Sequence, residues 1–282
     1  MQDIHHLPQQ GFRHMVNNVV FDVPQRLRRI RRLDLWLVPV VLAVFLGLWE
    51  VVIWAGDYPK FILPSVTDVA ASFSRTVQDG TLWRHTTATL VEVFGGLALG
   101  LTVALVLGYT LAKNEVIERL VSPYLVASQS IPTVAIAPLL IIWFGAGQLS
   151  KILIAALIVF FPALVNTIVG IRAVDHDLRD LMRALKADRW QTFWLLEVPA
   201  AMPVLLAGLK VSVTLSVIGA VIGEFMGADQ GLGFLINQAR GLFNTPLVFV
   251  AIISLVMITV SLYGGVTLLE RWLLRWQRDG RG

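Results

Sequence analysis

Long apolar runs, separated by short polar or charged stretches, constrain this sequence more than any other feature. A helix needs about 20 consecutive apolar residues to cross the hydrocarbon core of a bilayer, and residues 35–56 form one such run. Because lipid offers the backbone no hydrogen-bond partner, only helices and closed barrels span it. The runs predict an all-α polytopic membrane protein with about six transmembrane helices, near 35–56, 87–111, 132–144, 152–171, 204–226 and 247–269. An earlier start of the third is an open alternative, because residues 122–133 are mildly apolar.

The composition agrees with a membrane protein and excludes most soluble classes. Hydrophobic residues make up 56% of the 282 positions and charged residues 15%, whereas soluble domains hold about 45–50% and about 25%. A soluble fold with so few charges would expose large apolar patches. The chain has no cysteine, so disulfides, thiolate metal sites and cysteine nucleophiles are excluded.

The N-terminal segment is polar and rich in arginine. It contains His5, His6 and His14, which we expect in a solvated tail and not in a metal site. The apolar run that follows is too long for a signal-peptide core and lacks a cleavage site, so we expect it to be the first span. The expected organisation is a cytoplasmic tail over 1–33, a transmembrane domain over 34–270 and a second cytoplasmic tail over 271–282.

Basic residues are distributed unequally between the two sides of the predicted membrane. The side that holds both termini has seventeen lysines and arginines, and the opposite side has five. Cytoplasmic loops carry such an excess, so both termini are predicted to be cytoplasmic. The net charge of +4 then follows from topology, and nucleic acid is not an expected partner.

Two predicted spans carry small residues at every fourth position. Such stripes let helix backbones approach closely in lipid, and we expect close packing, although helices that slide against each other would show the same pattern. The stripes are Gly96, Gly100, Ala104 and Gly108 in one span, and Gly219, Gly223 and Gly227 in the other.

The sequence lacks the motifs of nucleotide hydrolysis and of common hydrolases. None of the five lysines follows a glycine, so G-x-x-x-x-G-K-[ST] is absent, as are H-E-x-x-H and G-x-S-x-G. His85, the one histidine near a span, has no companion. We therefore expect no catalytic residue, no metal site and no cofactor, and active transport would need an energy source in another subunit.

Ionisable residues inside spans are candidates for function by default. Glu50, Glu92, Lys210 and Glu224 lie in the predicted spans. Three of them lie within about two turns of an interface, where side chains reach the headgroups, which favours pairing or structural roles. Glu224 is the candidate for contact with a cationic or amide-bearing solute. The candidate translocation path consists of Glu224, Ser128, Asn166 and Ser216.

The charged segment 172–190 has the periodicity of an amphipathic helix. Val174, Leu178, Leu181 and Leu185 recur at i, i+4, i+7 and i+11, and Asp175 or Asp177 is the expected cap. A cytoplasmic amphipathic helix between two spans either lies on lipid or inserts into a groove of another protein.

This segment resembles the EAA loop of ABC importer permeases, whose pattern is E-A-A-x-x-x-G-A followed by an apolar stretch that reaches a proline. Ala187 and Pro199 match the pattern, whereas Lys186 replaces its glycine and leaves the turn geometry open. The other replacements are Asp180 for the glutamate and Leu181 and Met182 for the two alanines.

Shorter segments extend the resemblance over residues 60–276. Most are similar to the nitrate, sulfonate and taurine branch of these permeases, whereas 223–228 and 244–248 are closer to members linked to pyrimidine (thiamine-precursor) or flavin uptake. The segments of the first group are 63–65, 131–135, 143–145, 149–151, 161–162 and 231–233.

The resemblance implies a type I ABC importer permease of the bacterial inner membrane, with no catalytic role of its own. Two copies, as a homodimer, would enclose a path for a small organic solute of the pyrimidine, riboflavin, sulfonate, taurine or nitrate type. A coupling helix near 172–190 would dock into a P-loop ATPase subunit. The implied docking residues are Asp180, Leu181, Met182, Ala184, Leu185, Lys186, Ala187 and Pro199.

A solute-binding protein, periplasmic or lipid-anchored, would dock on residues 57–84 or 228–246. Two alternatives remain at this stage. A self-contained secondary transporter would be expected to have midplane carboxylates and an inverted repeat. A membrane-embedded enzyme or scaffold would need a nucleophile or a metal set on its spans.

Overall fold

The computed structural model describes residues 27–275, and these are helical throughout apart from turns and loops. Helix α2 (Leu27–Gly56) belongs to one compact unit, and the chain from Tyr58 onward forms a second. The three tail histidines and most of both predicted tails lie outside the described residues. With 30 residues, α2 is about 45 Å long, which is enough to cross a bilayer.

Five helices in the described range are long and apolar enough to cross a membrane. They confirm five of the six predicted spans, with ends that extend beyond the apolar runs. These helices are α2, α4 (Thr81–Lys113), α7 (Gln148–Arg172), α10 (Val198–Gly227) and α12 (Thr245–Leu273).

The predicted span at 132–144 is wrong as a single crossing helix. Helix α6 (Thr133–Phe144) has 12 residues and is about 18 Å long, short of the roughly 30 Å of a bilayer core. Helix α5 (Glu115–Gln129) precedes it, and the chain breaks between them near Pro132, where proline cannot donate a backbone bond and disfavours helix before it.

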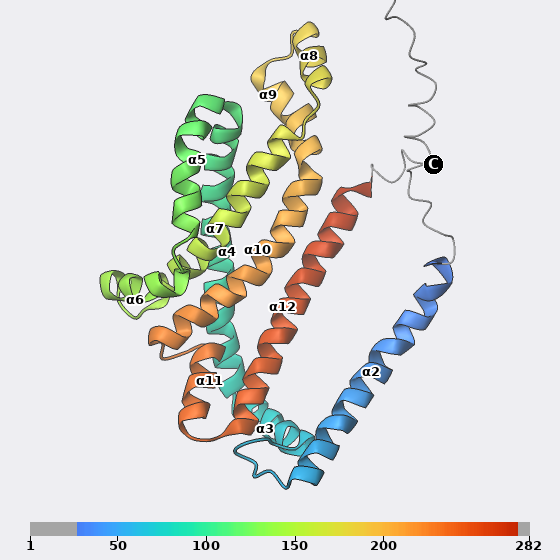
Figure 1. Ribbon diagram of the computed structural model, residues 1–282, viewed down its shortest axis with the longest axis vertical. Coiled ribbons are helices and arrows are strands. Elements are labelled where there is room, and N and C mark those ends of the chain that lie inside the picture. Colours follow the sequence, from blue (N-terminus) through green and yellow to red (C-terminus); the bar gives the residue numbers. More distant parts are fainter. Residues whose placement is uncertain (1–26, 276–282) are drawn as a thin grey trace, which may run out of the picture. The chain divides into compact units, whose positions relative to one another are not determined.

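Helices α5 and α6 together return the chain from the end of α4 to the start of α7. In Figure 1, α4 and α7 run in the same direction, so the segment between them must run back. Two observations fix α5 in place. Glu118 in its first turn pairs with Arg172 at the end of α7, and Val121 and Leu125 pack against the core that contains Ala104.

Helix α7 lies between α4 and α10 and forms the most extensive contacts in the second unit with both. Gly96 of α4 and Gly219 of α10 face the same residue, Ala155 of α7; a Cβ atom on Gly219 would lie 2.5 Å from the Ala155 Cα. A Cβ on Gly223 would lie 3.0 Å from Lys151. The small residues of both stripes therefore allow close packing of the helices. Gly227 is the exception, because a Cβ there would lie at an ordinary van der Waals distance from its neighbours.

The remaining short helices lie at the two ends of this bundle. Helices α3 (Val66–Gln78) and α11 (Leu232–Gly241) lie near the start of α4, whereas α8 (His176–Ala184) and α9 (Arg189–Thr192) follow the end of α7 (Figure 1). Ser65 caps α3 in a capping box with Asp68. Hydrogen bonds from Lys60 and Ser65 hold the pKa of Asp68 below its usual range.

Candidate coupling segment and translocation path

Helix α8 begins and ends with side-chain and backbone caps that its sequence supplies. The Asp175 carboxylate accepts a hydrogen bond from the Asp177 backbone at 3.0 Å, which identifies Asp175 as the cap. At the other end, the Lys186 N–H donates to the Arg183 carbonyl at 2.9 Å. The Ala187 N–H donates to the Met182 carbonyl at 3.0 Å. These two bonds form a Schellman motif, so the predicted single helix over 172–190 is two short helices joined by a turn.

Lys186 occupies the left-handed conformation in this turn, with φ of 54°. A Schellman motif usually places glycine at this position, because a side chain costs free energy at positive φ. The left-handed turn that a glycine would favour therefore forms in this chain with a lysine in its place. Asp188 then starts α9 through a capping box with Gln191.

Three leucines, two in α8 and one at its C-cap, face outward. Leu178, Leu181 and Leu185 are 45%, 53% and 68% exposed, and none of the residues of α8 is buried. Val174, the first residue of the predicted apolar stripe, is buried and belongs to the bundle. An exposed leucine stripe on a polar helix is the surface that a partner protein covers in helix-in-groove recognition.

The other predicted docking residues surround this stripe. Asp180 and Ala184 are exposed, whereas Met182, Ala187 and Pro199 are partly buried. The Asp180 carboxylate accepts a hydrogen bond from Arg183 at 3.0 Å. The segment therefore brings seven of the eight predicted coupling residues together, and Pro199 stands apart in the first turn of α10.

Polar contacts, some of them buried, connect the stretch from α8 to the start of α10 with helices α4 and α7. Glu197, in the π-helical turn Phe193–Glu197 before α10, is buried and pairs with Lys113 at the end of α4. The Tyr109 hydroxyl donates to the same carboxylate at 3.1 Å. The Arg179 guanidinium of α8 donates to the Ile171 carbonyl of α7 at 2.7 Å. Sequence reasoning missed these contacts, although a glutamate within the otherwise apolar stretch 193–200 was a signal.

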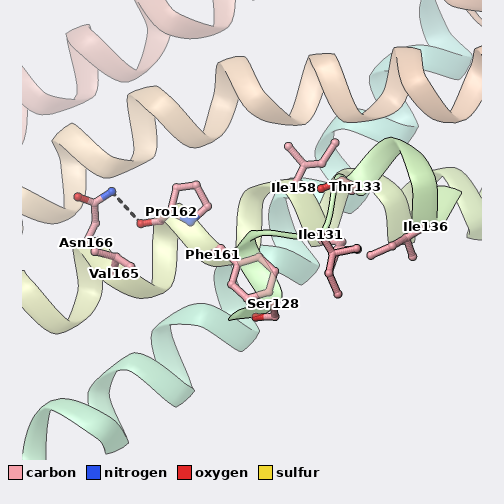
Figure 2. A pocket seen from close by; sticks show the side chains of 10 residues that line it. Ser128, Ile131, Thr133, Ile136, Ile158, Phe161, Pro162, Val165 and Asn166 are labelled. Carbon is pink, nitrogen blue, oxygen red and sulfur yellow. Dashed lines mark hydrogen bonds between the residues drawn. The ribbon is translucent and has the colours of Figure 1, made fainter. Parts of the chain in front are cut away.

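Two of the four predicted path residues line one cavity. Ser128 near the end of α5 and Asn166 in the C-terminal third of α7 border a space of about 510 Å³ (Figure 2). The Asn166 amide donates to the Pro162 carbonyl at 2.9 Å. Ser216 lies elsewhere, fully buried in α10, where its hydroxyl donates to the Val213 carbonyl at 3.0 Å.

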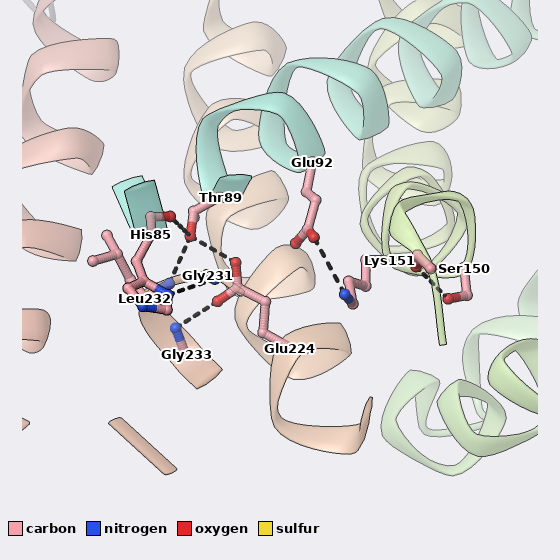
Figure 3. Close-up of polar contacts among 10 residues, drawn as sticks. His85, Thr89, Glu92, Ser150, Lys151, Glu224, Gly231, Leu232 and Gly233 are labelled. Carbon is pink, nitrogen blue, oxygen red and sulfur yellow. Dashed lines mark hydrogen bonds and ion pairs between the residues drawn. The ribbon is translucent and has the colours of Figure 1, made fainter. Parts of the chain in front are cut away.

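Glu224 does not line that cavity and is enclosed in a polar cluster (Figure 3). Its carboxylate accepts hydrogen bonds from the Thr89 hydroxyl at 2.6 Å and from the Gly233 backbone at 2.5 Å. Thr89 in turn accepts one from the Leu232 backbone at 2.8 Å, and His85 accepts one from Gly231 at 3.1 Å. These bonds join α4, α10 and the start of α11.

The same cluster contains a buried lysine. Lys151, at the start of α7, lies 3.7 Å from the Glu92 carboxylate, and both side chains are no more than 2% exposed. Lys210, the predicted intramembrane cation, pairs with Glu270 of α12 at 2.5 Å. Groups of His, Asp and Glu suited to a metal ion are absent from the described part of the chain.

A match to a protein family shows which family this chain belongs to. Residues 96–275 match the family described as "Binding-protein-dependent transport system inner membrane component". The chain belongs to this family. It is the permease subunit of an ATP-binding-cassette importer, a non-catalytic, multi-pass protein of the inner membrane. The secondary transporter and the membrane-embedded enzyme are thereby set aside.

Curated relatives support this placement along most of the permease. It is 47% identical to "Riboflavin transport system permease protein RibX" of Chloroflexus aurantiacus, over 90% of this chain and 96% of the relative. It is 35% identical to "Formylaminopyrimidine transport permease protein ThiX" of Halalkalibacterium halodurans, over 82% and 92%. "Taurine transport system permease protein TauC" of Escherichia coli is 28% identical, over 84% and 88%.

Solved structures agree on the fold. The permease superposes on a chain of the MetNI methionine ABC transporter in an inward-facing conformation with a TM-score of 0.61. The match covers 68% of this chain and 96% of that chain, at 20% identity. The expected ABC importer permease fold is confirmed. As part of a binding-protein-dependent system, the permease works with an ATPase and a solute-binding protein.

Proposed function

We propose that this permease couples to its ATPase through the α8–α9 segment. The observation that carries the proposal is the exposed stripe of Leu178, Leu181 and Leu185 on a helix that has no buried residue. Leucines three, four and seven residues apart are typical anchors of a helix that enters a groove. The proposed docking surface consists of these leucines with Asp180, Met182, Ala184, Lys186 and Ala187. Pro199 lies outside this surface, in the first turn of α10.

The proposed topology places this segment and both termini in the cytoplasm. Support comes from the basic residues at this end of the bundle, five of which lie within 172–190. The transmembrane domain over 34–270 then lies between tails over 1–33 and 271–282. A periplasmic or lipid-anchored binding protein would dock at the opposite end, on the α3 and α11 segments.

The proposed assembly contains two copies of the permease around a path for a small organic solute. The named relatives transport riboflavin, formylaminopyrimidine and taurine, so the candidate solutes are of the pyrimidine, flavin, sulfonate, taurine or nitrate type. Ser128 and Asn166 are the proposed path residues with a cavity beside them. Ser216 is kept as a proposed path residue although it is buried in this structure. Glu224 is proposed to stabilise the packing of α4, α10 and α11, and contact with solute is the alternative that Glu224→Gln tests.

Purification of the tagged permease from native membranes in mild detergent tests this proposal. Mass spectrometry is expected to find a P-loop ATPase in near-equal amount, and Ala184→Glu is expected to lose it while keeping its thermal stability. Thr102→Val, a neutral change on α4 outside the segment, is the matched control. A well-folded permease that transports solute without an ATPase would contradict the proposal.

A further inference from the structure

We infer that the cavity at the break between α5 and α6 binds a neutral, flat heteroaromatic ring, and not an anion. This inference rests on the proposed function, because it assigns a solute class to the path of that permease. The cavity has a volume of about 510 Å³, within the range of roughly 300–1,000 Å³ that small-molecule sites occupy.

The side chains around the cavity carry polar groups but no charge. The ten residues that line it include Ser128, Thr133 and Asn166, and the other seven are apolar. Taking an anion out of water costs several kcal/mol unless a cation or many donors replace its hydration. No arginine or lysine lines the cavity to pair with a sulfonate. A neutral ring with a few polar edge atoms would lose little hydration free energy on entering it.

A break between two helices on one side of the cavity, and a proline inside a helix on the other, add hydrogen-bonding capacity. The chain breaks between α5 and α6, directly beside Ser128 and Thr133. On the facing helix α7, Pro162 has no N–H to donate to the Ile158 carbonyl, so the regular bond of that turn is missing. Non-helical backbone at membrane depth is tolerated where it lines a cavity or is buried in protein.

The Asn166 side chain is held in position to form hydrogen bonds with the edge of such a ring. One of its amide hydrogens is engaged by the Pro162 carbonyl at 2.9 Å, which leaves a donor and an acceptor on the same planar group. Gly208 of α10 packs against its other side, since a Cβ there would lie 2.9 Å from the Asn166 Cβ. An amide with adjacent donor and acceptor complements the imide or amidine edge of a pyrimidine-like ring.

An aromatic side chain supplies the apolar surface that a flat ring needs. Phe161, next to Pro162, lines the cavity, and its ring lies near Ser128 (Figure 2). Its ring is braced edge-to-face by Phe160 at a centroid distance of 4.9 Å. Aromatic pairs gain attraction beyond their buried area, so a planar solute would bind more tightly here than a flexible aliphatic one of equal size.

The test measures binding of four probes to the detergent-purified complex of permease and ATPase: riboflavin, a hydroxymethylpyrimidine, taurine and ethanesulfonate. At least one of the two ring compounds is expected to bind more tightly than both sulfonates. Asn166→Leu and the isosteric Thr133→Val are each expected to weaken that ring's binding by roughly tenfold, the loss of one or two hydrogen bonds. Thr102→Val, outside the cavity, is expected to leave it unchanged.

The outcomes separate this inference from the function on which it rests. Preference for a sulfonate, ring binding that both substitutions leave intact, or no binding of any probe would overturn the ring site while the ATPase remains bound. Loss of the ATPase from the unmodified complex would instead overturn the proposed coupling. Each variant is compared at equal thermal stability, and Thr133→Val gives the result if Asn166→Leu fails to fold.

Discussion

The polar cluster around Glu224 and the leucine stripe of α8 lie toward opposite ends of the bundle and depart from ordinary burial in opposite ways. In the cluster, Glu92, Lys151 and Glu224 are almost completely buried, and each contacts polar groups of this chain. On α8, leucines are exposed, and the described part of the chain provides nothing to cover them.

This difference separates structural residues from docking residues. A buried charge with its partners inside the chain stabilises one arrangement of helices, and its removal leaves an uncompensated partner. An exposed apolar stripe gains nothing from the folded chain, so its contribution comes only when another protein binds. The first region should therefore respond to mutation in stability, and the second in coupling.

The largest expected effect is on stability, from Lys151→Met. This change leaves the Glu92 carboxylate buried without its cation, and removal of one member of a buried ion pair costs about 3–5 kcal/mol. Unfolding in detergent, followed by temperature or denaturant, measures the loss. Lys60→Met is the control, because the Lys60 side chain is 78% exposed. Equal stability of the two variants would contradict a structural role for the cluster.

Leu181→Asp is expected to act on coupling with little effect on stability. A charge in the centre of the leucine stripe should reduce solute uptake and ATPase association at least tenfold, since a central contact in an interface is worth about 2 kcal/mol or more. Val116→Asp at the start of α5, also an exposed apolar residue, is the control. Uptake that is normal in Leu181→Asp would remove α8 from the coupling surface.

Glu224→Gln distinguishes a structural carboxylate from one that contacts solute. A glutamine amide cannot accept the hydrogen bonds of both Thr89 and Gly233, so we expect a loss of about 1–3 kcal/mol in unfolding free energy. The relative uptake of different solutes should stay the same. Asp229→Asn, at an exposed acidic residue, is the control for stability and should leave the unfolding free energy unchanged. A change in which solute is imported would instead place Glu224 on the path.

The smallest expected effect is from Lys186→Gly. Glycine adopts positive φ without a steric penalty, so the unfolding free energy measured in detergent should rise by about 1 kcal/mol or less. Lys186→Val is the matched comparison and should lower stability, because a β-branched residue is strained there. A stabilising effect of valine would show that the turn is not formed as described.

The sequence was sufficient for features that depend on neighbours along the chain. Hydropathy predicted the five long spans, and the leucine periodicity predicted a helix in 172–190 with Asp175 or Asp177 as its cap, of which the structure has Asp175. The third crossing was misplaced because α5 contains charged residues such as Glu118, which is neutralised by Arg172 more than fifty residues away. Local hydropathy cannot anticipate such a partner.

Contacts between residues distant in the sequence also explain which site residues could not be predicted. Lys151 was counted with the outer basic residues, yet it is buried beside Glu92, because α4 and α7 pack closely at their glycines and alanines. The pairing of Glu197 with Lys113 also depends on which helices are neighbours. The cavity at Asn166 depends on the break at Pro132 and on the proline in α7.

Site-specific cross-linking from Leu181→Cys tests the central claim most directly. The natural chain has no cysteine, so a thiol-reactive cross-linker acts on the permease only at the introduced residue. A cross-linked product that contains the ATPase is expected from Leu181→Cys, and none from Asp79→Cys at the other end of the bundle. Absence of the ATPase product from Leu181→Cys, in a complex that still transports solute, would contradict the claim.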